Sequence, residues 1–297
     1  MEYFRKRPAF TLSVLAILAF GVGSATAIFT VVNGVLFTAL PYRAPGNLVR
    51  VFGTWEHGSR EGVSPPDLAD YRERATLFES IAGASIATPL LNLTAAGDPE
   101  QVRSRNVTAG FFSTLGIQPL LGREFRKEDE VWKGPAVAIL SYGLWQRQYG
   151  GQASVLGERL TINGVSYTIV GVLPPFFNFL GSTDLFTPVQ YNPAPGMRSA
   201  RILIVIGRLK SDLGQARTEL DVLGRRLQAE HAQFNRGWSA TAAPLNDEVV
   251  KDVRIGLEML LAAIGLVILL VSASIASITS VRQSTLRCAI SRVVSDT

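Results

Sequence analysis

The side chains that most often carry chemistry in proteins are few in this sequence and lie far apart. Of the two histidines, His57 lies in a polar stretch and His231 near the end of a predicted helix, and neither has a second ligand at metal-site spacing. The single cysteine is Cys288. No phosphate-binding loop, G-x-S-x-G, H-E-x-x-H or C-x-x-C motif occurs. The sequence therefore predicts no catalytic, cofactor-binding or metal-binding residues, and we expect a protein that is not an enzyme.

Three further groups of residues favour structural interpretations. The acidic run at residues 128–130 follows two basic residues, which is more typical of a solvated turn than of a catalytic carboxylate pair. The N-x-T triplets at Asn92 and Asn106 match the glycosylation pattern, but such short patterns arise by chance and both lie in predicted strands. Three aromatic residues recur three and four positions apart, which predicts a packing face of a helix rather than a ligand cage: Tyr142, Trp145 and Tyr149.

Two long apolar segments dominate the rest of the sequence. Residues 8–42 and 259–281 contain no Asp, Glu, Lys or Arg. A bilayer core about 30 Å thick is crossed by roughly 20 helical residues, so we predict membrane helices over 10–42 and 255–281. The first would be about 20 Å longer than the core. A signal peptide cleaved after residue 27 is the alternative, but it would leave an uncovered apolar N-terminus, so we favour an uncleaved span.

Charge near these segments predicts the topology. Of the net charge of +5, the excess lies at the outer ends of the apolar segments, on Arg5, Lys6, Arg7, Arg282, Arg287 and Arg292. Basic residues next to membrane spans favour the cytoplasm, so residues 1–9 and 282–297 are expected there, and the large middle segment, 43–254, is expected to be translocated, as in a multi-pass membrane protein. The middle segment is nearly neutral, which is not the pattern of a nucleic-acid-binding protein, and it has no cysteine for a disulfide.

The middle segment predicts a mixture of strands and helices. Alternating or β-branched runs predict strands over 48–55, 85–95, 100–109, 135–141, 200–209 and 237–245. Helices are predicted over 64–83, where Ser64 is the N-cap and Pro65 the first residue, over 110–116 and over 142–150. Asn163 and Gly164 separate two alternating runs, which predicts a hairpin with a type I′ turn.

The longest helix of the middle segment is predicted over 211–231. Its apolar face comprises Leu213, Ala216, Leu220, Leu223 and Leu227, and a helix packed on a sheet is favoured over a short coiled coil. Together these elements indicate an α+β domain over 43–254. Strand–helix–strand units are predicted at its two ends, 43–108 and 199–254, with a strand-rich part inserted over 109–198.

Four stretches of this segment, which follow one another along the chain, resemble a known family: VTAGFFSTLGIQPLLGREF, VAILSYGLWQRQYGG, VLGERLTINGVSYTIVGVLPP and DLFTPV. They are similar to the periplasmic core domain of MacB-type ABC transporter permeases with FtsX-like membrane helices, in wording close to acidobacterial members. The resemblance implies a porter-like part with an inserted subdomain, a stalk above the first span, and a permease that passes ATPase-driven motion to the periplasm. It also implies a separate ABC ATPase and a homodimer or a pair with a related permease.

The resemblance also indicates which residues would contact the ATPase. The family continues after the second span with a coupling helix, and the matching positions here are Arg282, Gln283, Leu286 and Arg287. For the arginines, simple anchoring by positive charge is an equal alternative. This segment lacks the family's Glu and its A-L-G ending, and two further spans are missing, so we expect an incomplete copy.

Two functional hypotheses follow. The first is an inner-membrane permease component of a MacB-type ABC transporter. The second is a membrane-anchored periplasmic binding or sensing module that works without an ATPase. The sequence does not identify a substrate or the ATPase.

Overall fold

The computed structural model describes residues 42–55, 58–94, 99–179 and 181–248, with some single residues and short runs between 19 and 30 and between 256 and 273. The chain divides into two compact units, 1–38 with 250–297, and 39–249. In the described part of the chain, no helix is long and apolar enough to cross a membrane. Most of the two predicted spans, and all of residues 1–9 and 282–297, lie outside the described residues. The description below concerns the unit 39–249.

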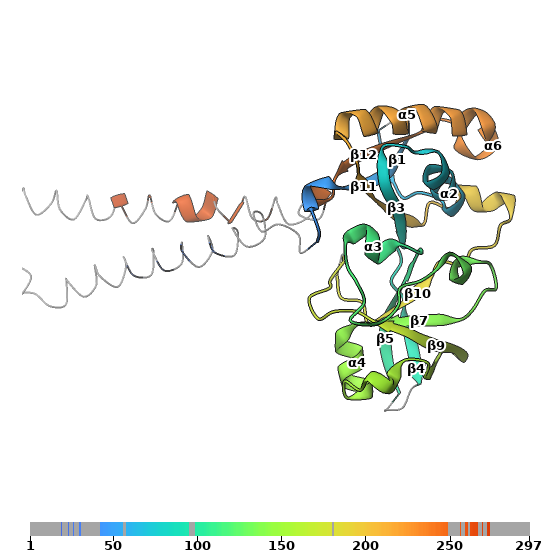
Figure 1. The fold of residues 1–297 in the computed structure, drawn as a ribbon. Coiled ribbons are helices and arrows are strands. Elements are labelled where there is room, and N and C mark those ends of the chain that lie inside the picture. The colour runs from blue at the N-terminus through green and yellow to red at the C-terminus, as the bar shows by residue number, and fades with distance from the viewer. Residues whose placement is uncertain are drawn as a thin grey trace, which may run out of the picture. The chain divides into compact units, whose positions relative to one another are not determined.

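This unit is built on one twelve-stranded sheet that is accompanied by α-helices and 3₁₀ turns (Figure 1). The strands are β1 (Leu48–Trp55), β2 (Arg60–Glu61), β3 (Phe78–Ser85), β4 (Leu90–Thr94), β5 (Glu100–Val107), β6 (Leu121–Gly122), β7 (Val137–Leu140), β8 (Arg159–Ile162), β9 (Val165–Val172), β10 (Leu185–Pro188), β11 (Leu203–Leu209) and β12 (Trp238–Pro244). The α-helices are α2 (Pro65–Arg74), α3 (Phe111–Leu115), α4 (Tyr142–Tyr149), α5 (Leu213–Glu230) and α6 (Ala232–Asn235). The 3₁₀ turns are η1 (Pro45–Asn47), η2 (Lys127–Glu130), η3 (Ala153–Val155) and η4 (Pro195–Ser199).

Strands from the two ends of the unit, β1 with β3 and β11 with β12, form what we call the open half. Its antiparallel strand order is β12-β1-β11-β3, and the chain passes β1, α2, β3, β11, α5 and β12. This is the split β-α-β-β-α-β arrangement of ferredoxin-like domains. Both long helices pack on one face of the sheet, where Leu68 and Tyr71 of α2 and Leu220 of α5 meet Val49 and Val205.

Six of the strands between β3 and β11 form a closed ring, which we call the barrel half. The pairings run β5-β10-β7-β9-β8-β4 and return from β4 to β5. The pairs β5–β10 and β7–β9 are parallel and the others antiparallel. Strand closure leaves no free edge in this ring, so it is a small β-barrel. Its apolar cluster includes Leu93, Leu140, Leu160 and Ile169, and α4 adds Leu144 and Trp145.

Several sequence predictions are confirmed here. Ser64 caps α2, accepting from the Asp67 N–H at 3.2 Å, with Pro65 in the first turn. Asn163 and Gly164 have φ values of 47° and 84°, the two positive values of a type I′ turn. The aromatic face of α4 is buried, and α5 lies on the sheet rather than in a coiled coil.

Two local predictions are wrong. The helix predicted over 64–83 ends at Arg74, and residues 78–85 form β3 instead. The strand is favoured because β3 pairs with β11 from Ser85 to Phe78. This tertiary pairing overrides the local preference for a helix. The strand predicted over 85–95 begins only at Leu90 in the structure, after a loop that contains Pro89.

Candidate functional site

The open and barrel halves meet at a seam with little strand pairing. β3 and β5 share one register pair, Ala84 with Val107. Next to it, the Gly83 N–H donates to Thr108 Oγ1 at 2.8 Å, and the Thr108 N–H donates to the Gly83 carbonyl at 2.9 Å. Because so few backbone bonds cross this seam, side-chain packing must hold the two halves together.

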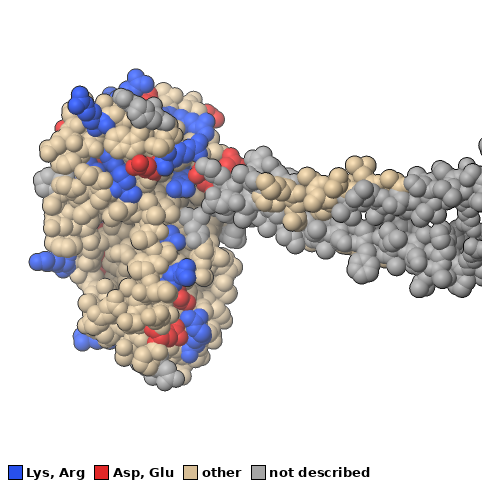
Figure 2. All heavy atoms as spheres, turned by 180° about the vertical axis from the view of Figure 1, so that it is seen from behind, with Lys and Arg blue, Asp and Glu red and all other residues tan. Residues whose placement is uncertain are grey.

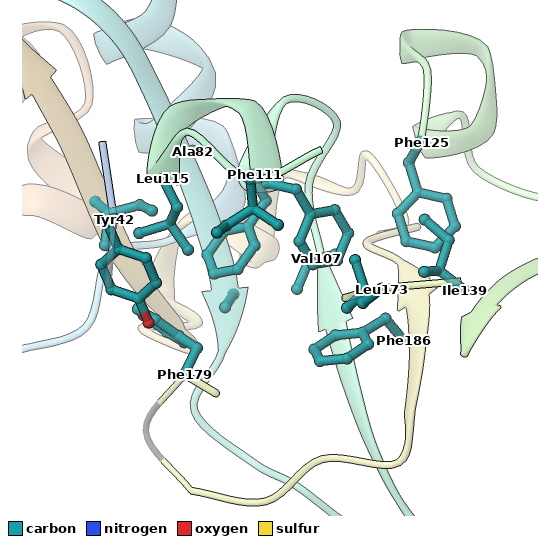
Figure 3. Close-up of a cluster of buried hydrophobic side chains, with 14 of the residues drawn as sticks. Tyr42, Ala82, Val107, Phe111, Leu115, Phe125, Ile139, Leu173, Phe179 and Phe186 are labelled. Carbon is teal, nitrogen blue, oxygen red and sulfur yellow. The ribbon is translucent and has the colours of Figure 1, made fainter. Parts of the chain in front are cut away.

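An apolar cluster fills one side of the seam, and we call it the seam cluster (Figure 3). From the open half it includes Leu48, Ala82, Ala84, Ile204 and Ile206, and from the barrel half Val107, Ile139, Leu173 and Phe186, with Phe111, Phe112 and Leu115 of α3 between them. The ring centroids of Phe112 and Phe186 lie 5.4 Å apart in an edge-to-face contact. β11 is buried on both faces, since Val205 packs under α5 and its neighbours Ile204 and Ile206 enter the seam cluster.

Both ends of the unit enter this same cluster. Tyr42 and Leu245 are buried members of it, and Tyr42 lies beside Leu115 and Phe179 in Figure 3. The Tyr42 hydroxyl donates to the Asn178 carbonyl at 2.6 Å, and burial raises the pKa of Tyr42 to about 12. Residues near both ends of the unit therefore contact the core that joins its two halves.

A buried arginine adds a polar contact inside the seam. Arg208 is 4% exposed, and its Nε donates to the carbonyl of Thr114 at the end of α3 at 3.0 Å. Burial lowers the pKa of this guanidinium. The Arg208 side chain thus links β11 to α3 at a buried position, where water cannot take the place of this hydrogen bond.

On another side of the seam, Arg72 makes three contacts, of which the one to β3 lies within the open half and the other two cross to the barrel half. Its Nε donates to the Ile81 carbonyl at 2.9 Å, its Nη2 to the Ala109 carbonyl at 2.9 Å, and its Nη1 to Glu130 Oε2 at 3.2 Å. Glu130 also accepts from the Ala109 N–H at 2.6 Å. Both side chains are partly buried, which makes this pair more than a screened surface contact.

Two hollows of about 400 and 480 Å³ lie on either side of this pair and share Arg72 and Lys127. The first is formed by α2, η2 and the segment after β10, with Trp132 and Tyr191 among its lining residues. Trp132 is 44% exposed. Lys127 makes no ion pair among the described residues. The first hollow therefore offers a cation and an exposed aromatic ring to a ligand.

The acidic run at residues 128–130 is not the solvated turn that the sequence favoured. Asp129 is 3% exposed and accepts from Arg123 at 2.7 Å and from the Arg126 N–H at 2.9 Å. Burial by itself would raise the pKa of Asp129, but these bonds outweigh it and hold the pKa below its usual value. Of the three acidic residues only Glu128 is exposed, so two carboxylates of the run stabilise the fold.

A second charged network fixes the helices of the open half. Asp67 is fully buried in α2 and pairs with Arg198 at 2.5 Å and with Arg201. Asn235 of α6 donates to the same carboxylate at 3.1 Å. Arg201 also lies 3.8 Å over the ring of Trp238. These contacts join α2, η4, α6 and β12, which are far apart in the sequence.

No group of three or more His, Cys, Asp or Glu side chains that could hold a metal occurs among the described residues. On the face shown in Figure 2, basic side chains gather toward the end that carries α5, with acidic side chains between them. The predicted ATPase-contact residues Arg282, Gln283, Leu286 and Arg287, and also His57 and Cys288, lie outside the described residues. Arg72 and Glu130 stand 58 positions apart, so no local pattern could have predicted their pairing.

Comparisons with known proteins agree with this architecture. The model of the MacB-like periplasmic core domain matches residues 11–223. Comparison with curated proteins gave no match. Among solved structures, a domain of a protein described as a permease from Porphyromonas gingivalis has a TM-score of 0.52 at 16% identity, covering 69% of this chain and 92% of that one.

Two further solved structures are similar at lower scores. They are the extracellular domain of the noncanonic ABC-type transporter YknZ from Gram-positive bacteria (TM-score 0.47, 14% identity, 66% of this chain and 100% of that one) and the periplasmic region of MacB from Actinobacillus actinomycetemcomitans (0.48, 12%, 76% and 97%). The fold of this chain is similar to that of the P. gingivalis domain.

The mixed α/β unit is thus similar to the periplasmic domains of this family. The chain belongs to the MacB-like periplasmic core domain family, because the family model matches well over half of its length.

Proposed function

We propose that this chain is the inner-membrane permease component of a MacB-type ABC transporter, with residues 43–254 on the periplasmic side. Family membership supports the class of protein. The observation that carries the mechanism is that Tyr42 and Leu245, at the two ends of the unit, both belong to the seam cluster. A permease that passes motion to the periplasm needs such a connection between its chain ends and its periplasmic body.

The mechanism follows from close packing. Protein cores have the density of organic crystals and transmit displacement with little compression. A shift of the chain at Tyr42 would therefore move α3 and both halves together, with the Arg72–Glu130 pair limiting rotation at the seam. A separate ABC ATPase would supply the motion through Arg282, Gln283, Leu286 and Arg287, and the permease would act as a homodimer or with a related permease.

Co-purification tests the ATPase assignment. The full chain is expressed with the ABC ATPase of the same gene neighbourhood and extracted in detergent, and stimulated ATP hydrolysis is measured. If these residues contact the ATPase, Arg282→Gln with Arg287→Gln should weaken the association at least about tenfold, since charge-assisted contacts would be lost. Arg292→Gln is the matched control. Full association of the double variant would assign these arginines to membrane anchoring alone.

A membrane-anchored binding module without an ATPase is the second candidate, and the 400 Å³ hollow beside Trp132 and Lys127 favours it. It predicts no ATPase in the purified complex and a rise in melting temperature with a ligand that fills this hollow. Trp132→Ala with Lys127→Ala would remove that rise. Recovery of an active complex with the ATPase would decide for the permease.

A further inference from the structure

A polar groove runs along β12 at the outer end of the open half, away from the seam. Its volume is about 670 Å³, and its lining includes Thr54, Trp55, Arg217, Arg225, Gln228 and Thr241. The size suits a molecule of one or two sugar rings. None of these residues takes part in the Arg72–Glu130 pair or in the seam cluster.

The free edge of β12 is closed to strand addition, which excludes an extended peptide as the occupant. Arg217 Nε donates to the Ala242 carbonyl at 2.7 Å, on the edge that faces away from β1. At Gly224 a side chain would come within 2.8 Å of the Ala240 nitrogen, so α5 lies directly against this edge. A partner strand could pair with β12 only if α5 moved away.

The groove instead offers side-chain groups that suit a polyhydroxylated molecule. Beyond its bond to Ala242, Arg217 has no partner for its terminal nitrogens among the described residues. The Gln228 amide and the Thr54 and Thr241 hydroxyls make no side-chain bond there either, so donors and acceptors are both present. Sugar hydroxyls donate and accept at once, and planar amide and guanidinium groups can bind two neighbouring hydroxyls.

An aromatic ring completes the groove. Trp55 is half-buried and stands edge-on to the fully buried Trp238, with centroids 5.3 Å apart and planes at 77°. This contact holds the Trp55 indole in a fixed orientation, so its stacking surface is ordered before a ligand arrives. The C–H face of a pyranose ring packs on such a surface.

The positive charge of the groove favours a sugar that carries a negative charge. Arg217 and Arg225 face one carboxylate, Asp221, which already pairs with Arg225 at 2.7 Å and accepts from the Ser239 hydroxyl at 2.9 Å. One positive charge remains uncompensated, and basic side chains gather over this half in Figure 2. A guanidinium binds a carboxylate through two parallel bonds.

We propose that this groove binds an acidic saccharide, with Trp55 stacking on a ring and Arg217 and Arg225 binding its carboxylate. The groove also differs from a compact phosphate site, because it has no cluster of backbone N–H groups at a helix N-terminus and it carries Asp221. The proposal does not depend on ATPase coupling.

Tryptophan fluorescence of the full chain tests it, in nanodiscs or in a detergent without a sugar headgroup, because alkyl glycosides would compete. The probes are digalacturonic acid and neutral galactobiose. We expect saturable quenching by the acidic sugar with a Kd at least about tenfold lower than for the neutral one. Higher salt should reduce this difference.

Three variants sharpen the test. Arg225→Gln lies on an exposed position and should weaken binding of the acidic sugar about tenfold while leaving the melting curve unchanged, and Trp55→Leu should remove the quenching. Arg226→Gln, on the same helix but outside the groove, is the matched control. Absence of saturable quenching, or equal affinity of Arg225→Gln and the parent chain, would overturn the proposal, and equal affinity for both sugars would overturn its acidic part.

Discussion

The two halves of this unit protect the edges of their β-strands in different ways. The barrel half closes on itself, so each of its six ring strands has a neighbour on both sides. The open half ends at β12, whose outer edge is covered by α5 through the close approach of Gly224 to Ala240. The barrel is therefore specified by strand pairing, whereas the open half depends on where its helices are held.

A buried carboxylate organises the helices of the open half. The clustered core of the barrel half is apolar, built from residues such as Leu140, Leu160 and Ile162. In the open half, fully buried Asp67 holds two arginines and so fixes α2 relative to η4 and α6. A buried charge costs desolvation energy, but it permits one arrangement of partners, which is what a set of separate helices requires.

The largest expected effect comes from Asp67→Asn. It leaves Arg201 without its carboxylate partner, and removing one member of a buried pair costs about 3–5 kcal/mol. Chemical unfolding of the full chain, followed by tryptophan fluorescence, measures it. Asp70→Asn is the control, because Asp70 is less buried and Arg198 would keep Asp67. Equal losses in the two variants would mean that Asp67 does not organise the helices.

Leu140→Ala probes the barrel half in the same assay. Leu140 is fully buried on β7, and loss of its side chain leaves a cavity that costs about 2–5 kcal/mol. Because the closed pairing fixes the strands, the loss should appear without a change in the steepness of unfolding. The exposed Leu90→Ala serves as the control, with little change expected. A shallower transition in Leu140→Ala would show that the barrel can unfold by itself.

Asp129→Asn tests the acidic run at the seam. The carboxylate has a lowered pKa in the folded state, so its stabilising effect is complete above the ordinary pKa near 4 and is lost as pH falls through the folded value. At pH 7 the variant should lose about 1.5–3 kcal/mol, the range for hydrogen bonds to a charged group. The gap between parent and variant should narrow below about pH 4. A gap that stays constant down to pH 2 would assign the loss to packing.

The smallest effect is expected at the hairpin of the barrel half. Gly164 has a φ of 84° and open space around its Cβ position, so Gly164→Ala should cost about 1–2 kcal/mol through backbone strain alone. Gly46→Ala also adds a methyl group into open space, but Gly46 has no positive φ, and it should be nearly neutral. Equal melting curves for both variants would contradict the type I′ assignment.

Sequence patterns identified the elements whose cause is local. The N-cap at Ser64, the Asn163–Gly164 turn, the aromatic face of α4 and the apolar face of α5 each depend on residues within a few positions, and the structure has all of them. The family resemblance rested on such local wording, and the family match bears it out. The boundaries of the predicted parts, both spans and the coupling residues remain predictions.

Only the tertiary structure decided how these elements combine. Closure of the barrel needs the pairing of β5 with β10, which are 78 or more positions apart, and β3 forms because β11 returns beside it. The role of the acidic run likewise depended on partners: Glu130 became a seam contact because Arg72, 58 positions earlier, folds against it. Local sequence sets backbone preference and the buried face, but a distant partner sets the environment of a charge, and no pattern along the chain contains that information.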